Sequence, residues 1–186
     1  EASARLGIAS GGLAYWIAAV RECFEESGIL IAWDEQRRPV SAERAAALAH
    51  LRAPLNAGEL SFAEFLERER LVVPAHQLAY FGHWVTAPGR SRRFDTRFFV
   101  AVAPLGQAGS HDNSETIHNL WLPPREALER NAQGGIELVF ATKHTLAELA
   151  RFSRPYDAFE HVKALQEIET NRACWAQGKD GAKLFR

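Results

Sequence analysis

Three glutamates early in the chain have the spacing of a metal-binding helix face. Glu22, Glu25 and Glu26 lie at positions i, i+3 and i+4, which share one face of an α-helix at about 100° per residue. Carboxylates this close repel one another and raise each other's pKa unless a cation holds them. A hard divalent cation such as Mg²⁺ or Mn²⁺ prefers oxygen ligands. We therefore expect Glu22, Glu25 and Glu26 to be metal ligands.

The residues around the glutamates fit a helix that rests on a core. Ile17, Val20 and Phe24 fall on the opposite face, where they can pack against other apolar residues. Gly28 can take the left-handed conformation that ends a helix, and the apolar residues 29–33 predict a buried strand. The alternative is a surface helix with a solvated acidic face, which is the usual role of clustered charges. The combined pattern favours the metal site.

Residues 21–29 resemble the second half of the Nudix box, in which Arg-Glu is followed by a pair of glutamates and a glycine. Every defined position of that half matches. In the first half Gly7 fits, but Leu13 stands where the family pattern has a glutamate, so we expect an insertion ahead of Arg21. The strand that leads into the box in this family is expected to precede Glu1.

Two further stretches resemble one branch of the Nudix hydrolases, related to the peroxisomal coenzyme A diphosphatases. The first is His83–Pro88 followed by Arg92–Phe99, and the second is Glu115 followed by Trp121–Leu128. The resemblance implies one domain over residues 1–186. Its expected fold is α/β, a Nudix-type α/β/α sandwich with a mixed sheet and a helical insertion at about residues 36–72.

The resemblance also implies roles for single residues. Glu22 or Glu115 would act as the base toward water, and Arg21 would fix a glutamate of the box by an ion pair without touching substrate. Arg93 and Arg97 lie in a basic cluster, and planar guanidinium groups suit a diphosphate. A solvated hairpin is the alternative for that cluster. We expect Arg93 and Arg97 to bind substrate.

Local patterns predict strands interleaved with helices, which is typical of an α/β layered domain. A capping box at Ser61 and Glu64 marks one helix start, and a second is predicted at residues 145–148. Strands are expected at 29–33, 78–86, 94–103, 120–122 and 136–140. Helices are expected at 42–52, 62–70 and 156–170.

Composition limits the class of protein. A chain of 186 residues is long enough for one sizeable core. The formal net charge of −1 argues against sequence-independent nucleic-acid binding, which needs a basic face. Cys23 and Cys174 are too few for a disulfide framework, so we expect reduced thiols and a cytoplasmic protein. No apolar run approaches the ~20 residues of a membrane span.

These observations lead to one functional hypothesis with two alternatives. We expect an enzyme that uses Mg²⁺ or Mn²⁺ to cleave the diphosphate of a small nucleoside diphosphate derivative, with coenzyme A or acyl-coenzyme A favoured by the branch. A homodimer is kept open as its assembly, and neither nucleic acid nor membrane is expected as a partner. The first alternative is an ADP-ribose or NADH diphosphatase. The second is a non-catalytic ligand-binding or regulatory module with the Nudix fold.

Overall fold

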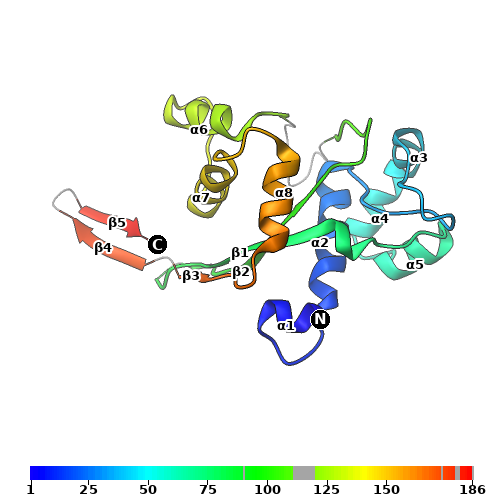
Figure 1. Ribbon diagram of the computed structural model, residues 1–186, viewed down its shortest axis with the longest axis horizontal. Coiled ribbons are helices and arrows are strands. Elements are labelled where there is room, and N and C mark those ends of the chain that lie inside the picture. Colours follow the sequence, from blue (N-terminus) through cyan, green and yellow to red (C-terminus); the bar gives the residue numbers. More distant parts are fainter. Residues whose placement is uncertain (90, 111–119, 173, 179–180, 186) are drawn as a thin grey trace. The chain divides into compact units, whose positions relative to one another are not determined.

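The computed structural model describes residues 1–89, 91–110, 120–172, 174–178 and 181–185, and Figure 1 names its helices and strands. The chain divides into two compact units, which are described separately. Unit 1 comprises Glu1–Ala4, Ile8–Leu78 and Ala101–Trp121. Unit 2 comprises Arg5–Gly7, Ala79–Val100 and Leu122–Arg186.

Most of unit 1 is helical, and its longest helix is α2, Leu13–Ser27, which carries the three glutamates. A short helix α1 precedes it, and a group of short helices follows residue 41. Their bounds are α1 Ala2–Leu6, α3 Ala42–Leu48, η1 Ala49–Leu51, α4 Arg52–Asn56, α5 Phe62–Arg68 and η2 Ala75–Gln77. The stretch predicted as a helical insertion, about residues 36–72, contains α3, η1, α4 and α5.

Capping explains where the helices of the insertion begin. The Ser41 hydroxyl accepts a hydrogen bond from the backbone N–H of Arg44 and caps the N-terminus of α3. The capping box predicted at Ser61 and Glu64 is present at the start of α5. Pro54 does not break α4 as a proline in a helix interior would. It lies in the first turn of that helix, where a backbone N–H would have no intrahelical acceptor.

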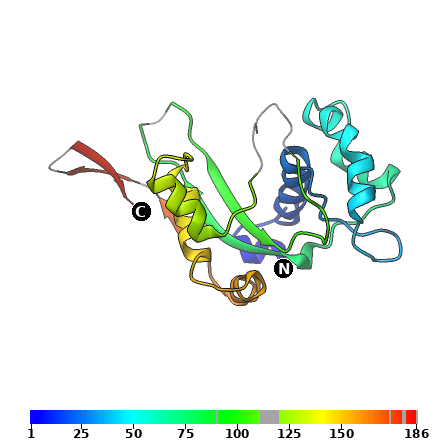
Figure 2. The same cartoon turned by 90° about the horizontal axis from the view of Figure 1, so that it is seen from above.

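The core of unit 1 joins the insertion to α2. Phe24 is fully buried and stacks on Phe65 of α5 with 5.4 Å between ring centroids, and Phe65 in turn stacks on Phe62 at 5.5 Å. Figures 1 and 2 show α4 beside α2. The indole N–H of Trp16 donates to the backbone carbonyl of Leu78 at 3.1 Å. The insertion therefore shares its core with the helix of the glutamates and packs against it.

Unit 2 contains a three-stranded sheet in the order β2-β1-β3. Strand β1 (Leu78–Val85) runs parallel to β3 (Thr170–Arg172). The connection from β1 to β2 (Asp95–Ala101) is too short for a parallel crossover, so these two strands are antiparallel and the sheet is mixed. The predicted α/β class with a mixed sheet is confirmed. Strands β4 (Cys174–Gly178) and β5 (Gly181–Phe185) form a separate antiparallel pair.

Helices cover one side of the sheet of unit 2, as Figure 1 shows. Phe159 and Val162 of α8 (Pro155–Ala164) pack with Ala79 of β1. Phe140, the first residue of α7 (Phe140–Leu149), contacts the indole of Trp84 edge to face. Helix α6 (Pro124–Ala132) precedes α7 and begins at Pro124, a residue that suits the first helical position. The side chains that β1 and β2 present on this face of the sheet therefore pack against α7 and α8.

Several predicted elements are wrong. Residues 29–33 form no strand: Trp33 makes isolated bridges, and the backbone of Leu30 is hydrogen-bonded to the Gln107 side chain instead of a neighbouring strand. Residues 120–122 lack strand structure, and the indole of Trp121 donates to Ala108. Residues 136–139 also lack strand structure, because Val139 is exposed and caps α7.

Two predicted helix features are also wrong. The capping box at residues 145–148 lies inside α7 and caps nothing. The helix predicted over 156–170 ends at Ala164, because the chain extends at Leu165 and then pairs with β1 as β3. Across the part of the chain that the structure describes, none of the helices combines the length and apolar character required to cross a bilayer.

Candidate active site

The glutamates lie in the last turns of α2, and Gly28 ends that helix. Gly28 has a φ of 70° and its N–H donates to the Phe24 carbonyl at 2.9 Å. A Cβ at this position would approach the Ser110 hydroxyl to 3.0 Å and the Arg52 guanidinium to 3.3 Å. Glycine is therefore required both for the left-handed turn and for the close approach of these two side chains.

Arg21 joins two of the glutamates. Its Nη1 donates to Glu25 Oε2 at 2.7 Å, and its Nη2 donates to Glu22 Oε1. The predicted ion pair between Arg21 and a glutamate of the box is confirmed. The guanidinium thus neutralises part of the repulsion that neighbouring carboxylates would otherwise feel.

The three carboxylates differ in their access to solvent. The Glu22 side chain is 51% exposed, whereas that of Glu25 is 5% exposed, and Glu26 is half-buried. The expectation of three glutamates on one open face is therefore wrong for Glu25. A buried carboxylate is stable only when it is paired, and Arg21 supplies that pairing.

Arg52 is a buried residue of this region that sequence patterns did not identify. Its Nε and Nη2 donate to the carbonyl of Glu25 at 3.0 and 2.9 Å, and Nη2 also donates to the carbonyl of Glu26 at 2.8 Å. The last carbonyls of a helix lack intrahelical partners and carry partial negative charge. A single guanidinium from the insertion therefore caps the helix at the residues that bear the acidic side chains.

One signal could have revealed Arg52. It shares the buried side of the insertion with Ala45, Leu48 and Leu55, at helical spacings of three and four. An arginine within such an apolar stripe is unusual, because a buried charge requires partners. Its partners cannot be named from the stripe, because they lie on another helix.

The segment before residue 111 is tied to the same helix end. The Ser110 N–H donates to the Ser27 carbonyl at 2.7 Å, and the Ser110 hydroxyl accepts from Arg52 at 2.9 Å. Gln107 is buried and its amide binds the backbone of Leu30 and Val40. Glu115, the second candidate base, lies outside the described residues. The role of Glu115 therefore stays a prediction.

Arg93 and Arg97 belong to unit 2. Arg93 is exposed, and its Nε donates to the Thr86 carbonyl at 3.1 Å. Arg97 is 11% exposed, and its Nη1 donates to Asp95 Oδ1 at 2.9 Å. The same oxygen lies 2.6 Å from Nε2 of His83, whose Nδ1 meets Thr170 Oγ1 at 2.8 Å. His83 is therefore a hydrogen-bonded structural residue.

Burial and charge act in opposite directions on the pKa of Asp95. Burial of the carboxyl raises this pKa, but the hydrogen bond from His83 and the charges of His83, Arg97 and Arg172 outweigh burial and hold the pKa below its ordinary value. Asp95 is therefore the counter-ion of Arg97. The guanidinium of Arg97 is engaged within the sheet, whereas that of Arg93 is more open to a ligand.

Comparison with known protein families identifies the family to which the chain belongs. A family model described as the NUDT19 Nudix domain matches residues 4–151. The chain belongs to this Nudix family. The matched segment of the Nudix domain includes α2 with its glutamates, the insertion and the β1–β2 sheet strands.

Individual relatives agree with this assignment. The Nudix domain is 28% identical to acyl-coenzyme A diphosphatase NUDT19 of Xenopus laevis, over 92% of this chain and 49% of that protein. It is 30% identical to the protein of the same name from Gallus gallus, over 86% of this chain and 47% of that protein. The chain thus spans about half the length of these curated relatives.

A solved structure supports the fold. The crystal structure of a Nudix hydrolase from Alicyclobacillus acidocaldarius superimposes with a TM-score of 0.64 at 26% sequence identity. The superposition covers 81% of this chain and 65% of the other. The expected Nudix-type fold is confirmed.

The donor chemistry of α2 is compatible with a cation. Nudix hydrolases as a class use divalent metals, and the carboxylates of this Nudix domain are the hard oxygen donors that such ions prefer. Within the described residues, His, Cys, Asp and Glu side chains form no group of three or more that could hold a metal ion. Arg21 is instead the cation between Glu22 and Glu25. The residue types fit a hard divalent ion, and their ligand roles stay predictions.

Proposed function

We propose that this chain is a divalent-cation-dependent hydrolase that cleaves the diphosphate of coenzyme A or of an acyl-coenzyme A. The observation that carries the proposal is the helix end of α2. It combines a complete Arg-Glu-x-x-Glu-Glu-x-Gly pattern with an Arg21 ion pair and an Arg52 cap that hold the glutamates in place. The names of the NUDT19 relatives, acyl-coenzyme A diphosphatases, support this choice of substrate.

In this proposal Glu22, Glu25 and Glu26 hold Mg²⁺ or Mn²⁺. Such an ion screens phosphate charge and lowers the pKa of a bound water. Glu22 is exposed and can accept a proton from water, and Glu115 is the other candidate for that role. Arg21 stays on the glutamates and positions them.

Recognition of the substrate is assigned to the arginines of unit 2. Arg93 is exposed, and its guanidinium can donate two parallel hydrogen bonds to the oxygens of a phosphate. Arg97 is proposed as a second substrate residue. Because its guanidinium is paired with Asp95, replacing Arg97 would also disturb the local structure of β2. Cytoplasmic location and a homodimer remain proposals that accompany this function.

A panel of diphosphates tests the proposal directly. The purified protein is incubated with coenzyme A, octanoyl-coenzyme A, ADP-ribose and NADH, with Mg²⁺, with Mn²⁺ and with a chelator. We expect cleavage of the coenzyme A compounds to adenosine 3′,5′-bisphosphate and phosphopantetheine or its acyl derivative, dependent on the cation. Faster cleavage of ADP-ribose or NADH would favour that alternative substrate class.

One observation favours a second candidate, the non-catalytic module. Leu13 occupies the position of a glutamate in the first half of the box, and this side chain is 55% exposed at the start of α2. A ligand-binding domain without turnover has no need of that carboxylate. Binding of coenzyme A without cleavage under any cation would support this candidate and overturn the enzyme.

A further inference from the structure

Unit 2 contains an apolar cavity of about 360 Å³ that the proposed chemistry does not use. It lies where β1 and β2 meet the start of α7. Its lining includes Trp84, Phe94, Phe98, Val139 and Phe140. Ligand pockets of proteins usually begin at about 300 Å³ and are mostly apolar, so both the size and the lining suit a small ligand.

Two lining residues of this pocket, Trp84 and Phe140, belong to an aromatic cluster. His144 stacks on the indole of Trp84 with 5.5 Å between ring centroids, and it meets Phe140 edge to face at 4.3 Å. Phe140 lies edge-on to Trp84 at 5.8 Å. Trp84 is buried. Three mutually packed rings leave Trp84 and Phe140 little freedom to collapse into the cavity.

The mouth of the pocket exposes apolar side chains to solvent. Phe94 is 57% exposed and Val139 is 68% exposed. Both line the cavity. Covering them with an apolar ligand would remove this surface from water and is favourable in proportion to the area buried.

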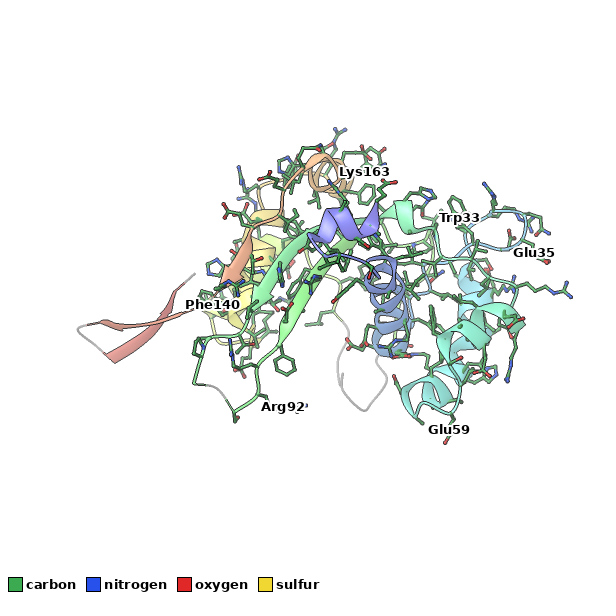
Figure 3. The ribbon with its side chains drawn as sticks, turned by 90° about the horizontal axis from the view of Figure 1, so that it is seen from below. Trp33, Glu35, Glu59, Arg92, Phe140 and Lys163 are labelled. Atoms are coloured by element: carbon green, nitrogen blue, oxygen red, sulfur yellow. The ribbon has the colours of Figure 1, made fainter. Side chains whose placement is uncertain are left out.

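Two arginines lie at the same mouth. The Arg92 guanidinium carbon is 5.8 Å from the centroid of the Phe94 ring, and Arg93 donates to the carbonyl of Thr86, which also lines the pocket. Both arginines are exposed. Figure 3 shows Arg92 at the turn between the strands and Phe140 on α7. A ligand with an apolar body and an anionic group would match the lining and the rim together.

We propose that this pocket binds a medium-length fatty acyl chain next to an anionic group. The alternative of a nucleobase fits less well, because the lining offers only the hydroxyls of Thr86 and Thr96 to the polar edge of a base. The Thr86 hydroxyl already accepts the Phe94 N–H at 2.9 Å. An acyl-coenzyme A would supply such a chain if the proposed function is correct, but the affinity of the pocket for an acyl chain stands on its lining alone.

Calorimetric titration with straight-chain carboxylates tests the proposal without turnover. Butyrate, hexanoate, octanoate and the corresponding octyl alcohol are used below the concentrations at which they aggregate. We expect affinity to rise about fourfold per added methylene, the equivalent of about 0.8 kcal/mol. We also expect the alcohol to bind more weakly than octanoate, because it lacks the charge that the arginines attract.

A charge at the mouth provides the matched variant. Val139→Asp should weaken octanoate binding by more than tenfold, because it places a carboxylate beside the pocket. The variant should fold, since Val139 is the N-cap of α7 and aspartate is a favourable N-cap. Val72→Asp is the control, since Val72 is 50% exposed and lies outside this pocket.

Five results would overturn the pocket assignment, four from the binding experiments and one from the assembly. The four are no binding of octanoate, affinity independent of chain length, equal loss in Val139→Asp and Val72→Asp, and displacement of octanoate by adenosine monophosphate. A dimer closed through this pocket that octanoate fails to dissociate would also overturn it. Cleavage of unacylated coenzyme A tests the proposed function separately, so failure of one proposal is distinguishable from failure of the other.

Discussion

Two arginine–carboxylate groups in this chain look alike in chemistry and differ in construction. On α2, Arg21 bridges Glu22 and Glu25 within one helix. In the sheet, Arg97 of β2 shares Asp95 with His83 of the neighbouring strand β1. The acid that accepts from each arginine differs most in solvent access: the Glu25 side chain is 5% exposed and that of Asp95 is 58% exposed.

The difference shows what each group can contribute. A buried carboxylate depends on its arginine, because no water replaces the lost partner. An exposed carboxylate is hydrated with or without its arginine, so its ion pair contributes little to stability. We therefore expect the helical group to hold reactive side chains in fixed positions, and the strand group to adjust the charge of a surface.

The largest effect on stability is expected for Phe24, which lies on the same helix as the Arg21–Glu22–Glu25 group and packs in the core. Phe24→Ala removes a fully buried ring stacked between α2 and α5, so we expect a loss of about 3–5 kcal/mol in the free energy of unfolding. Denaturant unfolding measures it. Leu13→Ala, on the same helix but exposed, is the control and should change stability by less than about 0.5 kcal/mol. Equal losses would mean that the core does not hold α2.

Removing each arginine tests the comparison itself. Arg21→Ala leaves the carboxylate of Glu25 buried with a partner lost, and we expect a cost of about 3 kcal/mol, near the lower end for a broken buried pair. Arg97→Met keeps an unbranched apolar side chain in place of the buried Arg97 stem and leaves Asp95 hydrated, so the lost ion pair should cost less than about 1 kcal/mol. Urea unfolding of both variants measures the difference. If Arg97→Met were the more destabilising change, the distinction by burial would fail.

Arg52 gives a sharper test of the helix end. Arg52→Ala removes hydrogen bonds from a charged donor to the last carbonyls of α2, and we expect a loss of about 1.5–3 kcal/mol. Arg52→Lys keeps the charge near the helix C-terminus and should recover part of it, on the order of 0.3–1 kcal/mol. Thermal unfolding compares the three proteins. No recovery by lysine would show that the fork geometry matters more than the charge.

The sequence predicted the parts of this molecule that depend on local spacing. The Arg21 pairing, the buried Phe24, the Gly28 helix end and the capping box at Ser61 each follow from residues a few positions apart. Periodicity also located the insertion and the strands β1 and β2. Such features carry their partners within the same stretch of sequence.

The features that sequence reasoning missed have distant partners. Arg52 binds a carbonyl 27 positions away, and Gln107 binds the backbone of Leu30 at a separation of 77. The second contact also explains the wrong strand at residues 29–33, because a side chain satisfies the backbone that a neighbouring strand was expected to pair. No pattern within one segment reports such a contact.

The smallest effect on stability is expected for Asp95 of the strand group when the pH is lowered. Because the pKa of Asp95 is lowered in the folded state, its ionised form stabilises the protein above its ordinary pKa, and this contribution is lost as the pH falls through the lowered value. The melting-temperature gap between the wild type and Asp95→Asn should therefore be full at about pH 6 and should shrink as the pH falls below the ordinary aspartate pKa of about 3.9. A gap that widened in acid would contradict the assigned direction.

The most direct test of the central claim measures Mn²⁺ binding and coenzyme A cleavage on the same two variants. Glu26→Gln removes one proposed ligand charge from α2, and Glu129→Gln changes an exposed glutamate of α6 as the control. The account predicts that Glu26→Gln lowers Mn²⁺ affinity by at least about tenfold and abolishes cleavage with an unchanged melting temperature, while Glu129→Gln behaves as wild type. A Glu26→Gln protein that bound Mn²⁺ and cleaved coenzyme A like the wild type would contradict it.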